Sequence, residues 1–293
     1  MAKNNFRNVV VSELEVKKCL NFAEQFTLTT NKKSDLDFGN SRKPRNQTDS
    51  LADTATGKIG ELAFQKICAS LGFNISVDFQ VNAGRHNIDY GQDLPEIEVG
   101  GNLLTPLIGV DIKTTKMDSQ WLLLENHKHW ASILVLIRVN LSNDAEKNLT
   151  AFNKDVECEF AGFAYLSDFY DFKGKAWFKF SENSRLLSSK SVNELYQNAL
   201  KTHGSITLRQ QLVSTYREMN NENITFIGPQ LECPFQVGLP RDFLRKSEAE
   251  LIDLLKFISQ LSVPKAQASS EVIQSIIKLN FKLSTASKEL NNT

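Results

Sequence analysis

The stretch Asn87–Lys116, NIDYGQDLPEIEVGGNLLTPLIGVDIKTTK, is the part of the chain from which its fold is best inferred. Near its end an apolar run leads into an acid, one spacer residue and a lysine, which are Asp111, Ile112 and Lys113. If Leu107–Thr115 forms a strand, the two-residue period of a strand puts Asp111 and Lys113 on the same face. A carboxylate and an ammonium side by side can hold a divalent cation and an attacking water together.

Two acids upstream of this strand are candidates to complete such a site. Asp89 and Asp93 lie one hairpin earlier, and Gly91, Gly100 and Gly101 bracket that hairpin. The Asp-x-Lys tripeptide is common in proteins, so its meaning depends on the elements around it.

A helix is predicted over Ala55–Leu71, with Gly72 as its C-terminal stop. Its apolar stripe consists of Ile59, Leu62, Ala63, Ile67 and Leu71. Glu61 lies close to this stripe, where a carboxylate is costly unless it has a cation partner. Two interpretations stay open: an exposed glutamate on the rim of the helix, or an acid directed at a metal.

The segment of residues 29–50 is polar, turn-rich and without periodicity, and we interpret it as a long loop. Its cations are Lys32, Lys33, Arg42, Lys43 and Arg45. Cations interleaved with Asn, Ser and Gln suit contacts to nucleic-acid phosphates, although a solvated loop would have the same composition. Lys116, which directly follows the Asp111 strand, joins the expected DNA contacts.

The remaining elements divide the chain into three parts. We expect a helix over Ser12–Phe26 that begins with a Ser12–Glu15 capping box, and a short helix or loop over Trp121–Trp130. The run Ile133–Val139 predicts a strand that is buried on both faces. Further strands are expected at Glu157–Tyr165 and Lys175–Phe180, a helical turn at Ser167–Phe169, and amphipathic helices at 191–201, 247–261 and 269–283, with an irregular segment before Pro240.

These elements give an N-terminal helix and basic loop (1–54), an α/β core (55–185) and a mostly helical C-terminal region (186–293). The C-terminal region is expected to contact DNA or to form a dimer.

Composition is that of an ordinary globular protein and selects no partner. Lys plus Arg and Asp plus Glu number 34 each in 293 residues, so only local clustering of charge is informative. The cysteines, Cys19, Cys68, Cys158 and Cys233, form no Cys-x-x-Cys pair and are expected to be buried thiols. We find no signal-peptide pattern and no apolar run near 18 residues, so we expect a cytoplasmic protein with no membrane partner.

Other motifs have less support. His127 and His129 are spaced to share a face of a strand, but without acid or cysteine partners we interpret them as a surface or DNA-facing pair. No P-loop, G-x-S-x-G or G-x-G-x-x-G pattern occurs, so these nucleotide-binding and esterase chemistries have no motif behind them.

The order of these elements resembles the PD-(D/E)xK nuclease superfamily, which includes many type II restriction endonucleases. The resemblance covers roughly residues 55–181 and is carried by GKIGELAF at 57–64, YGQDL at 90–94 and GVDIKTT at 109–115. It implies an α/β fold, with a restriction-endonuclease-like mixed central sheet flanked by helices and a helical C-terminal region.

The resemblance also assigns roles to residues. Asp111 would be the second metal-binding acid and the carbonyl of Ile112 a further ligand. Lys113 would orient the attacking water and offset charge in the transition state. Glu61 would match the helix acid that many members add, as a direct or water-mediated ligand.

The first acid is ambiguous because the sequence lacks a Pro-Asp pair. Asp93 fits better than Asp89, since an apolar residue follows it and the return to Asp111 begins directly. Hard oxygen ligands of this kind imply Mg²⁺, with Mn²⁺ as a substitute.

The resemblance implies a Mg²⁺-dependent endonuclease that hydrolyses phosphodiester bonds of double-stranded DNA, most simply a type II restriction enzyme acting as a homodimer. A structure-specific phage or repair nuclease is an alternative, as is a catalytically silent DNA-binding protein of the same fold. An α/β domain whose acids are incidental is the remaining interpretation.

Overall fold

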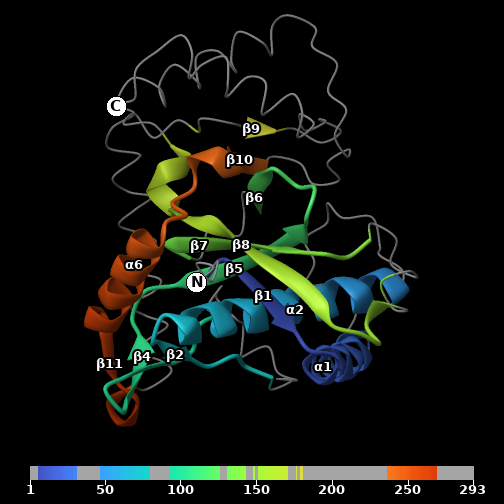
Figure 1. The fold of residues 1–293 in the computed structure, drawn as a ribbon, viewed down its shortest axis with the longest axis horizontal. Helices are drawn as coiled ribbons and strands as arrows, with labels where there is room; N and C mark the ends of the chain where they lie inside the picture. Colours follow the sequence, from blue (N-terminus) through green and yellow to red (C-terminus); the bar gives the residue numbers. More distant parts are fainter. Residues whose placement is uncertain are drawn as a thin grey trace, which may run out of the picture.

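The computed structural model describes residues 6–31, 47–79, 93–125, 131–142, 148, 151–170, 176, 179–180 and 236–268. Within these ranges the protein is mixed α/β, with its strands arranged in three sheets (Figure 1). The central sheet lies between a helical layer and a second, smaller sheet.

The central sheet consists of β1 (Asn8–Val11), β8 (Val156–Tyr165), β7 (Ile133–Val139) and β5 (Val110–Lys116), in that order. β5 runs parallel to β7, and the other neighbouring pairs are antiparallel. All seven residues of β7 are buried, which confirms the strand predicted from its continuous apolar run.

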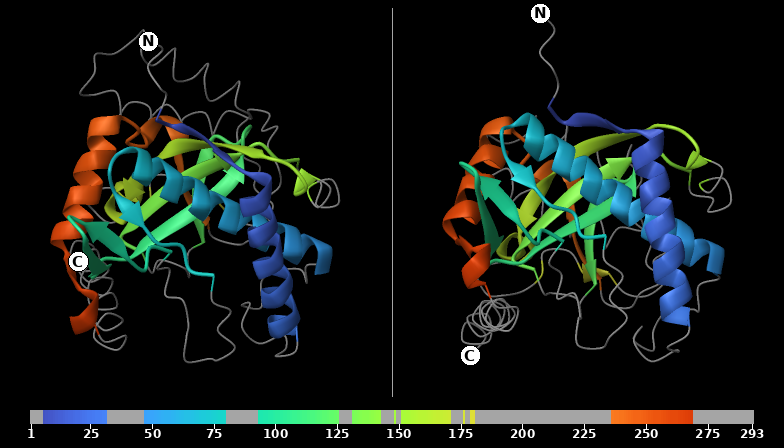
Figure 2. Two further views of the ribbon diagram at one scale, coloured as in Figure 1. Left: turned by 60° about the horizontal axis from the view of Figure 1, so that its bottom comes forward. Right: turned by 90° about the horizontal axis from the view of Figure 1, so that it is seen from below.

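Two helices cover one face of this sheet, α1 (Glu13–Asn31) and α2 (Gln47–Ser70) (Figure 2). The core between these helices and the sheet contains Ile112 of β5 and Phe64 of α2. The ring of Phe64 stacks on that of Phe160 of β8. The predicted apolar stripe of α2 supplies further buried side chains, including Ile59, Leu62, Ala63 and Ile67.

Local signals fix the start of α1 and the C-terminal end of α2 as the sequence predicts. The N–H and hydroxyl groups of Ser12 both donate to the Glu15 carboxylate at 2.8 Å, as expected of the capping-box pair at the start of α1. α2 ends at Ser70, and Gly72 just beyond it has a φ of +86°, which only glycine adopts easily, while the Phe73 N–H donates back to the Cys68 carbonyl.

The opposite face of the central sheet is covered by β6 (Trp121–Glu125), β10 (Gln236–Pro240) and β9 (Lys179–Phe180), which form the second sheet. Two 3₁₀ turns, η1 (Leu166–Phe169) and η2 (Arg241–Phe243), lie beside it. Leu134 and Leu136 of β7 pack into a separate apolar cluster there, together with Trp121, Leu122, Leu239 and Phe169.

The third sheet has the order β11 (Ser262–Pro264), β4 (Asn102–Pro106), β3 (Ile97–Val99) and β2 (Asn74–Ile75). Gly100 and Gly101 both have positive φ and make the two-residue turn between β3 and β4. Helix α6 (Glu248–Gln260), which begins with a Ser247–Glu250 capping box, leads through β11 into η3 (Lys265–Gln267).

The segment before α6 packs closely against β8 at Gly162. Gly162 has a φ of +136°, and a β-carbon there would lie 2.6 Å from Cβ of Leu244. Arg245 pairs its backbone with Phe163 and its guanidinium with the Asp168 carboxylate. The Arg245 guanidinium also lies 4.8 Å from the centre of the Tyr165 ring, so one arginine holds the C-terminal elements to the central sheet.

Several boundaries and elements differ from the sequence prediction. The short helix or loop expected at Trp121–Trp130 is wrong for its described part, which is strand β6, and the segment expected to be irregular contains β10. Both strands are too short for a clear alternating pattern, and each is ordered by the other. β1 was not predicted, and α1 and α2 extend into the predicted loop at 29–50.

The strand carrying Asp111 begins at Val110 and not at Leu107. Leu107 instead donates its N–H to the Leu261 carbonyl, next to β4 and the third sheet. The chain therefore changes sheet between Pro106 and Val110, so β4 and β5 are separate strands of different sheets.

Other predictions are confirmed, or lie outside the described residues. Cys19, Cys68 and Cys158 are buried free thiols, and burial raises the pKa of Cys19 and of Cys158 to about 12. The helices predicted at 191–201 and 269–283 lie outside the described residues, and the boundaries after residues 54 and 185 stay predictions. None of the described helices is long and apolar enough to cross a membrane.

Candidate active site

Asp111 and Lys113 form an ion pair on β5, with Nζ of Lys113 2.6 Å from Oδ2 of Asp111. The strand period predicts this shared face, and the contact confirms it. Asp111 is only 6% exposed, whereas the Lys113 side chain is 32% exposed. The pair thus joins a buried carboxylate to an ammonium group that solvent can reach.

Asp93 lies along the free edge of β5, which is the last strand of the central sheet. Its N–H donates to the Val110 carbonyl at 2.8 Å, and its Oδ2 accepts a hydrogen bond from the Ile112 N–H at 2.6 Å. The Asp93 carboxylate therefore takes the position that a carbonyl of a further strand would occupy.

This pairing also fixes the direction of the Ile112 carbonyl. The N–H and C=O of one strand residue point to the same side of the strand. Since the Ile112 N–H points to Asp93, the Ile112 carbonyl also points out of this edge, away from β7. The Asp93 carboxylate and the Ile112 carbonyl therefore lie on the same edge of β5, and Ile112 directly follows Asp111 in the chain.

Helix α2 meets β5 at a glycine. A β-carbon on Gly60 would lie 1.9 Å from Oγ1 of Thr114, and that hydroxyl is 3.5 Å from the Gly57 carbonyl. The close approach sets the backbone of Glu61, the next residue of the helix, beside β5.

Glu61 is buried, at 8% exposure, so the interpretation as an exposed rim residue is wrong. Nζ of Lys58, one helical turn earlier, lies 2.7 Å from its Oε2. The same ammonium lies 4.9 Å from the centre of the Phe22 ring. After burial, the Glu61 carboxylate is the next largest influence raising the pKa of Cys19 in α1. Glu61 thus has the cation partner that its burial requires, and it lies near α1.

The described oxygen atoms that could bind a metal at this part of β5 belong to the Asp93 and Asp111 carboxylates and the Ile112 carbonyl. Among the residues that the structure describes, no group of three or more His, Cys, Asp or Glu side chains could hold a metal ion. Two carboxylates and a carbonyl are nevertheless a hard oxygen set of the kind that fits Mg²⁺, an ion that usually keeps several waters.

Lys116 ends β5 and is partly buried. Burial lowers the pKa of its ammonium, while the carboxylates of Asp53 in α2 and of Asp118 act in the opposite direction. Its assigned contact to DNA stays a prediction.

Several predicted site residues lie outside the described residues. These are the reserve acid Asp89, the histidines His127 and His129, and the loop cations Lys32, Lys33, Arg42, Lys43 and Arg45. The described site is therefore the part built on β5, the Asp93 segment and α2.

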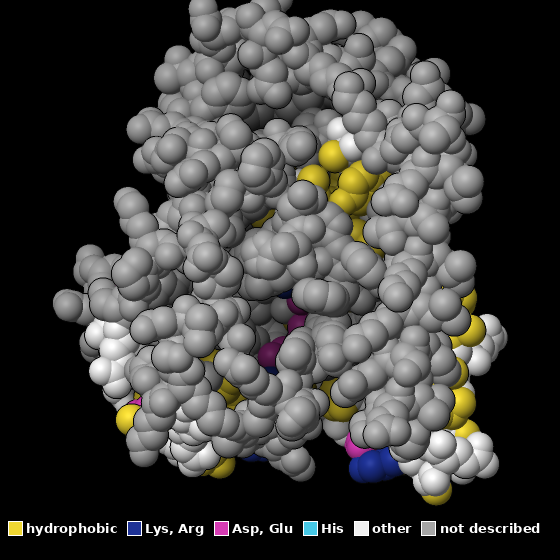
Figure 3. Space-filling view, turned by 180° about the vertical axis from the view of Figure 1, so that it is seen from behind, with side chains coloured by type: hydrophobic (Ala, Val, Ile, Leu, Met, Phe, Trp, Pro, Cys, Tyr) yellow, Lys and Arg dark blue, Asp and Glu magenta, His cyan; other side chains and the backbone are white. Residues whose placement is uncertain are grey.

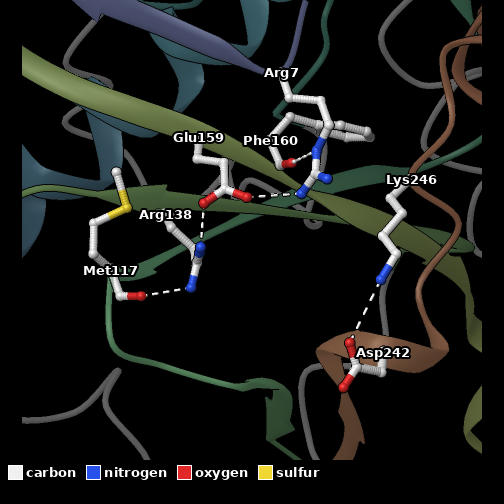
Figure 4. Close-up of polar contacts among 7 residues, drawn as sticks. All are labelled: Arg7, Met117, Arg138, Glu159, Phe160, Asp242 and Lys246. Atoms are coloured by element: carbon white, nitrogen blue, oxygen red, sulfur yellow. Dashed lines mark hydrogen bonds and ion pairs between the residues drawn. The ribbon is translucent and has the colours of Figure 1, made fainter. Parts of the chain in front are cut away.

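Sequence reasoning missed a polar network on the sheet face of Lys113 (Figure 4). Arg138 of β7 and Arg7, just before β1, both donate to the Glu159 carboxylate of β8. Arg138 also donates to the Met117 carbonyl at 2.5 Å. One signal could have revealed it: Arg138 is the single charged residue in the apolar run ILVLIRV, where a charge must have a partner.

The space-filling view from behind shows acidic side chains with basic atoms beside them (Figure 3). Comparison of the chain with models of protein families, with curated proteins and with solved structures found no match.

Proposed function

We propose that the protein is a Mg²⁺-dependent endonuclease that cleaves double-stranded DNA, most simply a type II restriction enzyme. The observation that carries the proposal is the convergence at β5. Asp93 bonds to the peptide N–H that directly follows Asp111, and Lys113 pairs with Asp111. Helix α2 packs on the opposite face of the same strand, through Gly60 and Thr114.

Each residue has a role that follows from its position. Asp93, Asp111 and the Ile112 carbonyl would hold the metal. When bound, Mg²⁺ would polarise a phosphoryl oxygen and offset developing negative charge. Asp111 is buried beside Lys113, so in the absence of a cation the ammonium neutralises it.

Lys113 is the part of the site that substrate can reach. An ammonium there can donate a hydrogen bond to the attacking water and attract the charge that develops on the phosphate oxygens. Glu61 remains a candidate for a water-mediated contact to the metal. Its carboxylate is paired with Lys58, so we assign it no direct contact to the metal.

DNA as the substrate, cleavage at a specific sequence and a homodimer are parts of the same proposal. Cutting both strands of a symmetric site is most simply done by a two-fold dimer. The resemblance of the motifs at 57–64, 90–94 and 109–115 supports the nuclease assignment.

The test is cleavage of a supercoiled plasmid in Mg²⁺ and in EDTA by the parent, Asp111→Ala and Lys113→Ala. We expect discrete fragments from the parent in Mg²⁺ only, and none from either variant. If both variants cut as well as the parent, the proposal is wrong.

The pattern of products separates the alternatives. Smearing or cleavage confined to branched DNA would favour a structure-specific nuclease. Tight DNA binding with no cutting in either Mg²⁺ or Mn²⁺ would favour a silent member of the fold.

A further inference from the structure

Two arginines converge on one carboxylate on the central sheet. Oε1 of Glu159 lies 2.7 Å from the guanidinium of Arg7, and its other oxygen accepts from Arg138. Arg7 also donates from Nε to the Phe160 carbonyl at 3.0 Å. Figure 4 shows both guanidiniums directed to Glu159 from opposite sides.

A third arginine approaches from the second layer. The backbone N–H of Arg241, the first residue of η2, donates to the Gln120 carbonyl at 2.7 Å. Burial lowers the pKa of its guanidinium, and the nearby charges of Arg138 and Arg7 lower it further, against the opposite effect of Asp242 and Glu159. Its side chain makes no hydrogen bond to another described residue. Arg7, Arg138 and Arg241 are called the arginine cluster below.

The arginine cluster and Lys246 lie around two described carboxylates. Asp242 lies across from Arg138 in Figure 4, and its Oδ1 is 3.5 Å from Nζ of Lys246. Among the described residues, three arginines and Lys246 thus share the carboxylates of Glu159 and Asp242. Partly buried guanidiniums that share a carboxylate favour a further anion.

Two buried atoms around the arginine cluster lack hydrogen-bond partners among the described residues. Nε of Arg138 has no hydrogen-bond acceptor, although the residue is only 8% exposed. Oδ2 of Asp242 has no donor. A hydrated oxyanion would supply both, because its oxygens accept from a guanidinium and its water donates to a carboxylate.

The position of the arginine cluster relates it to the candidate active site. Arg138 pairs in register with Thr115 of β5, so Asp111, Lys113, Thr115 and Arg138 lie on one face of the sheet. Lys113 and Thr115 are two residues apart on β5, which is about 7 Å along the strand, and Arg138 lies beside Thr115. A phosphate beside Arg138 would therefore be a near neighbour of one at Lys113.

We propose that the arginine cluster is a phosphate-binding site, and that on DNA it takes a backbone phosphate of the strand whose scissile bond lies at Lys113. The planar guanidinium fork matches phosphate oxygens in shape as well as in charge. The DNA part rests on the proposed function, whereas binding of a phosphate ion does not.

The first experiment measures thermal unfolding of the full chain in phosphate and in chloride of equal ionic strength. The variant is Arg241→Gln, which lies on a half-buried turn and leaves the Arg7–Glu159–Arg138 bonds in place. Lys17→Gln, which removes an exposed cation of α1, is the matched control. We expect phosphate to raise the Tm of the parent and the control, and the phosphate affinity of Arg241→Gln to fall about tenfold or more.

The second experiment measures binding of a duplex in EDTA, where the metal-dependent proposal expects no cutting, over a range of salt concentration. Loss of one phosphate contact lowers the slope of log K against log salt by about 0.9. We expect that change for Arg241→Gln and no change for Lys17→Gln.

The outcomes separate this inference from the proposed function. Phosphate stabilisation without DNA binding would keep the phosphate site and contradict the nuclease. If the parent cuts DNA but Arg241→Gln changes neither the phosphate response nor the salt slope, the inference is wrong and the nuclease stands. No phosphate response and no DNA binding by the parent would overturn both.

Discussion

Gly60 of α2 lies directly against Thr114 of β5, so closely that a β-carbon on Gly60 would be 1.9 Å from the threonine hydroxyl oxygen. The same β-carbon would lie 2.9 Å from Cγ2 and 3.0 Å from Cβ of Thr114, so rotating the threonine side chain cannot clear the space. This glycine therefore sets the distance between the helix carrying Lys58 and Glu61 and the strand carrying Asp111 and Lys113.

Replacing Gly60 with alanine is expected to destabilise the protein. Alanine favours a helix by about 1 kcal/mol over glycine, but overpacking a rigid contact costs about 1–3 kcal/mol, so a net loss is expected. Gly57→Ala is the matched control, because no atom lies within 4 Å of a β-carbon there, and it should be neutral or stabilising. Urea unfolding of both variants measures the difference. A Gly60→Ala protein at least as stable as Gly57→Ala would contradict the close packing.

The Lys58–Glu61 pair is expected to stabilise α2 as a unit. Because Glu61 is buried, removing Lys58 takes away a close counter-charge, a loss that costs about 3–5 kcal/mol for fully buried pairs and less where solvent reaches the group. Lys58→Met and Glu61→Gln should each destabilise, and the double variant should lose clearly less than their sum, by about 1 kcal/mol or more. Equilibrium unfolding of the three variants gives this coupling. Purely additive losses would mean that the pair contributes nothing as a pair.

Two helix caps predict a loss of stability in acid. Burial alone would raise the pKa of Glu15, but hydrogen bonds from Lys66 and Ser12 outweigh it, so the pKa lies below its usual value. Burial alone would also raise the pKa of Glu250, but hydrogen bonds from Ser247 and Lys246 outweigh it and the pKa is lowered. A lowered folded-state pKa gives stability that is present above the unfolded pKa of about 4.3 and is lost as pH falls through the folded value.

The urea midpoint of the parent should therefore fall as pH is lowered from about 5 towards 3, in part through these two acids. The urea midpoints of Glu15→Gln and Glu250→Gln should be lower than that of the parent at pH 7, and they should fall less as the pH is lowered. Glu13→Gln is a suitable control, since Glu13 lies in an exposed pair with Lys17. Identical acid profiles for the parent and both cap variants would count against the lowered pKa values.

Much of the central sheet and the chemistry on β5 could be predicted from short-range patterns. The run at Ile133–Val139 is apolar without interruption, and the Asp111–Lys113 spacing places both side chains on one face through the period of a strand. The C-terminal end of α2 and the start of α6 follow from Gly72 and Ser247, where the hydrogen bonds are local and do not depend on distant contacts.

What the sequence could not reveal depends on long-range contacts. β6 and β10 are ordered by pairing across more than a hundred residues, and β1 by pairing with β8. The partner of Glu61 is visible in the sequence only as a lysine three residues earlier, and nothing local distinguishes it from a solvated cation. Only the fold brings Arg7, Arg138 and Arg241 of the arginine cluster together with Glu159.

The central claim, that the β5 site cleaves DNA, is tested most directly by the rate of plasmid cleavage in Mg²⁺ for Lys113→Ala against Lys17→Ala. Both variants remove one lysine that is paired with a carboxylate, but only Lys113 belongs to the β5 site. We expect Lys113→Ala to cut at least about 100-fold more slowly than the parent, the typical cost of removing one donor to a transition state. Lys17→Ala should cut at the parental rate. Equal rates for the two variants, or no metal-dependent cutting by the parent, would contradict the account.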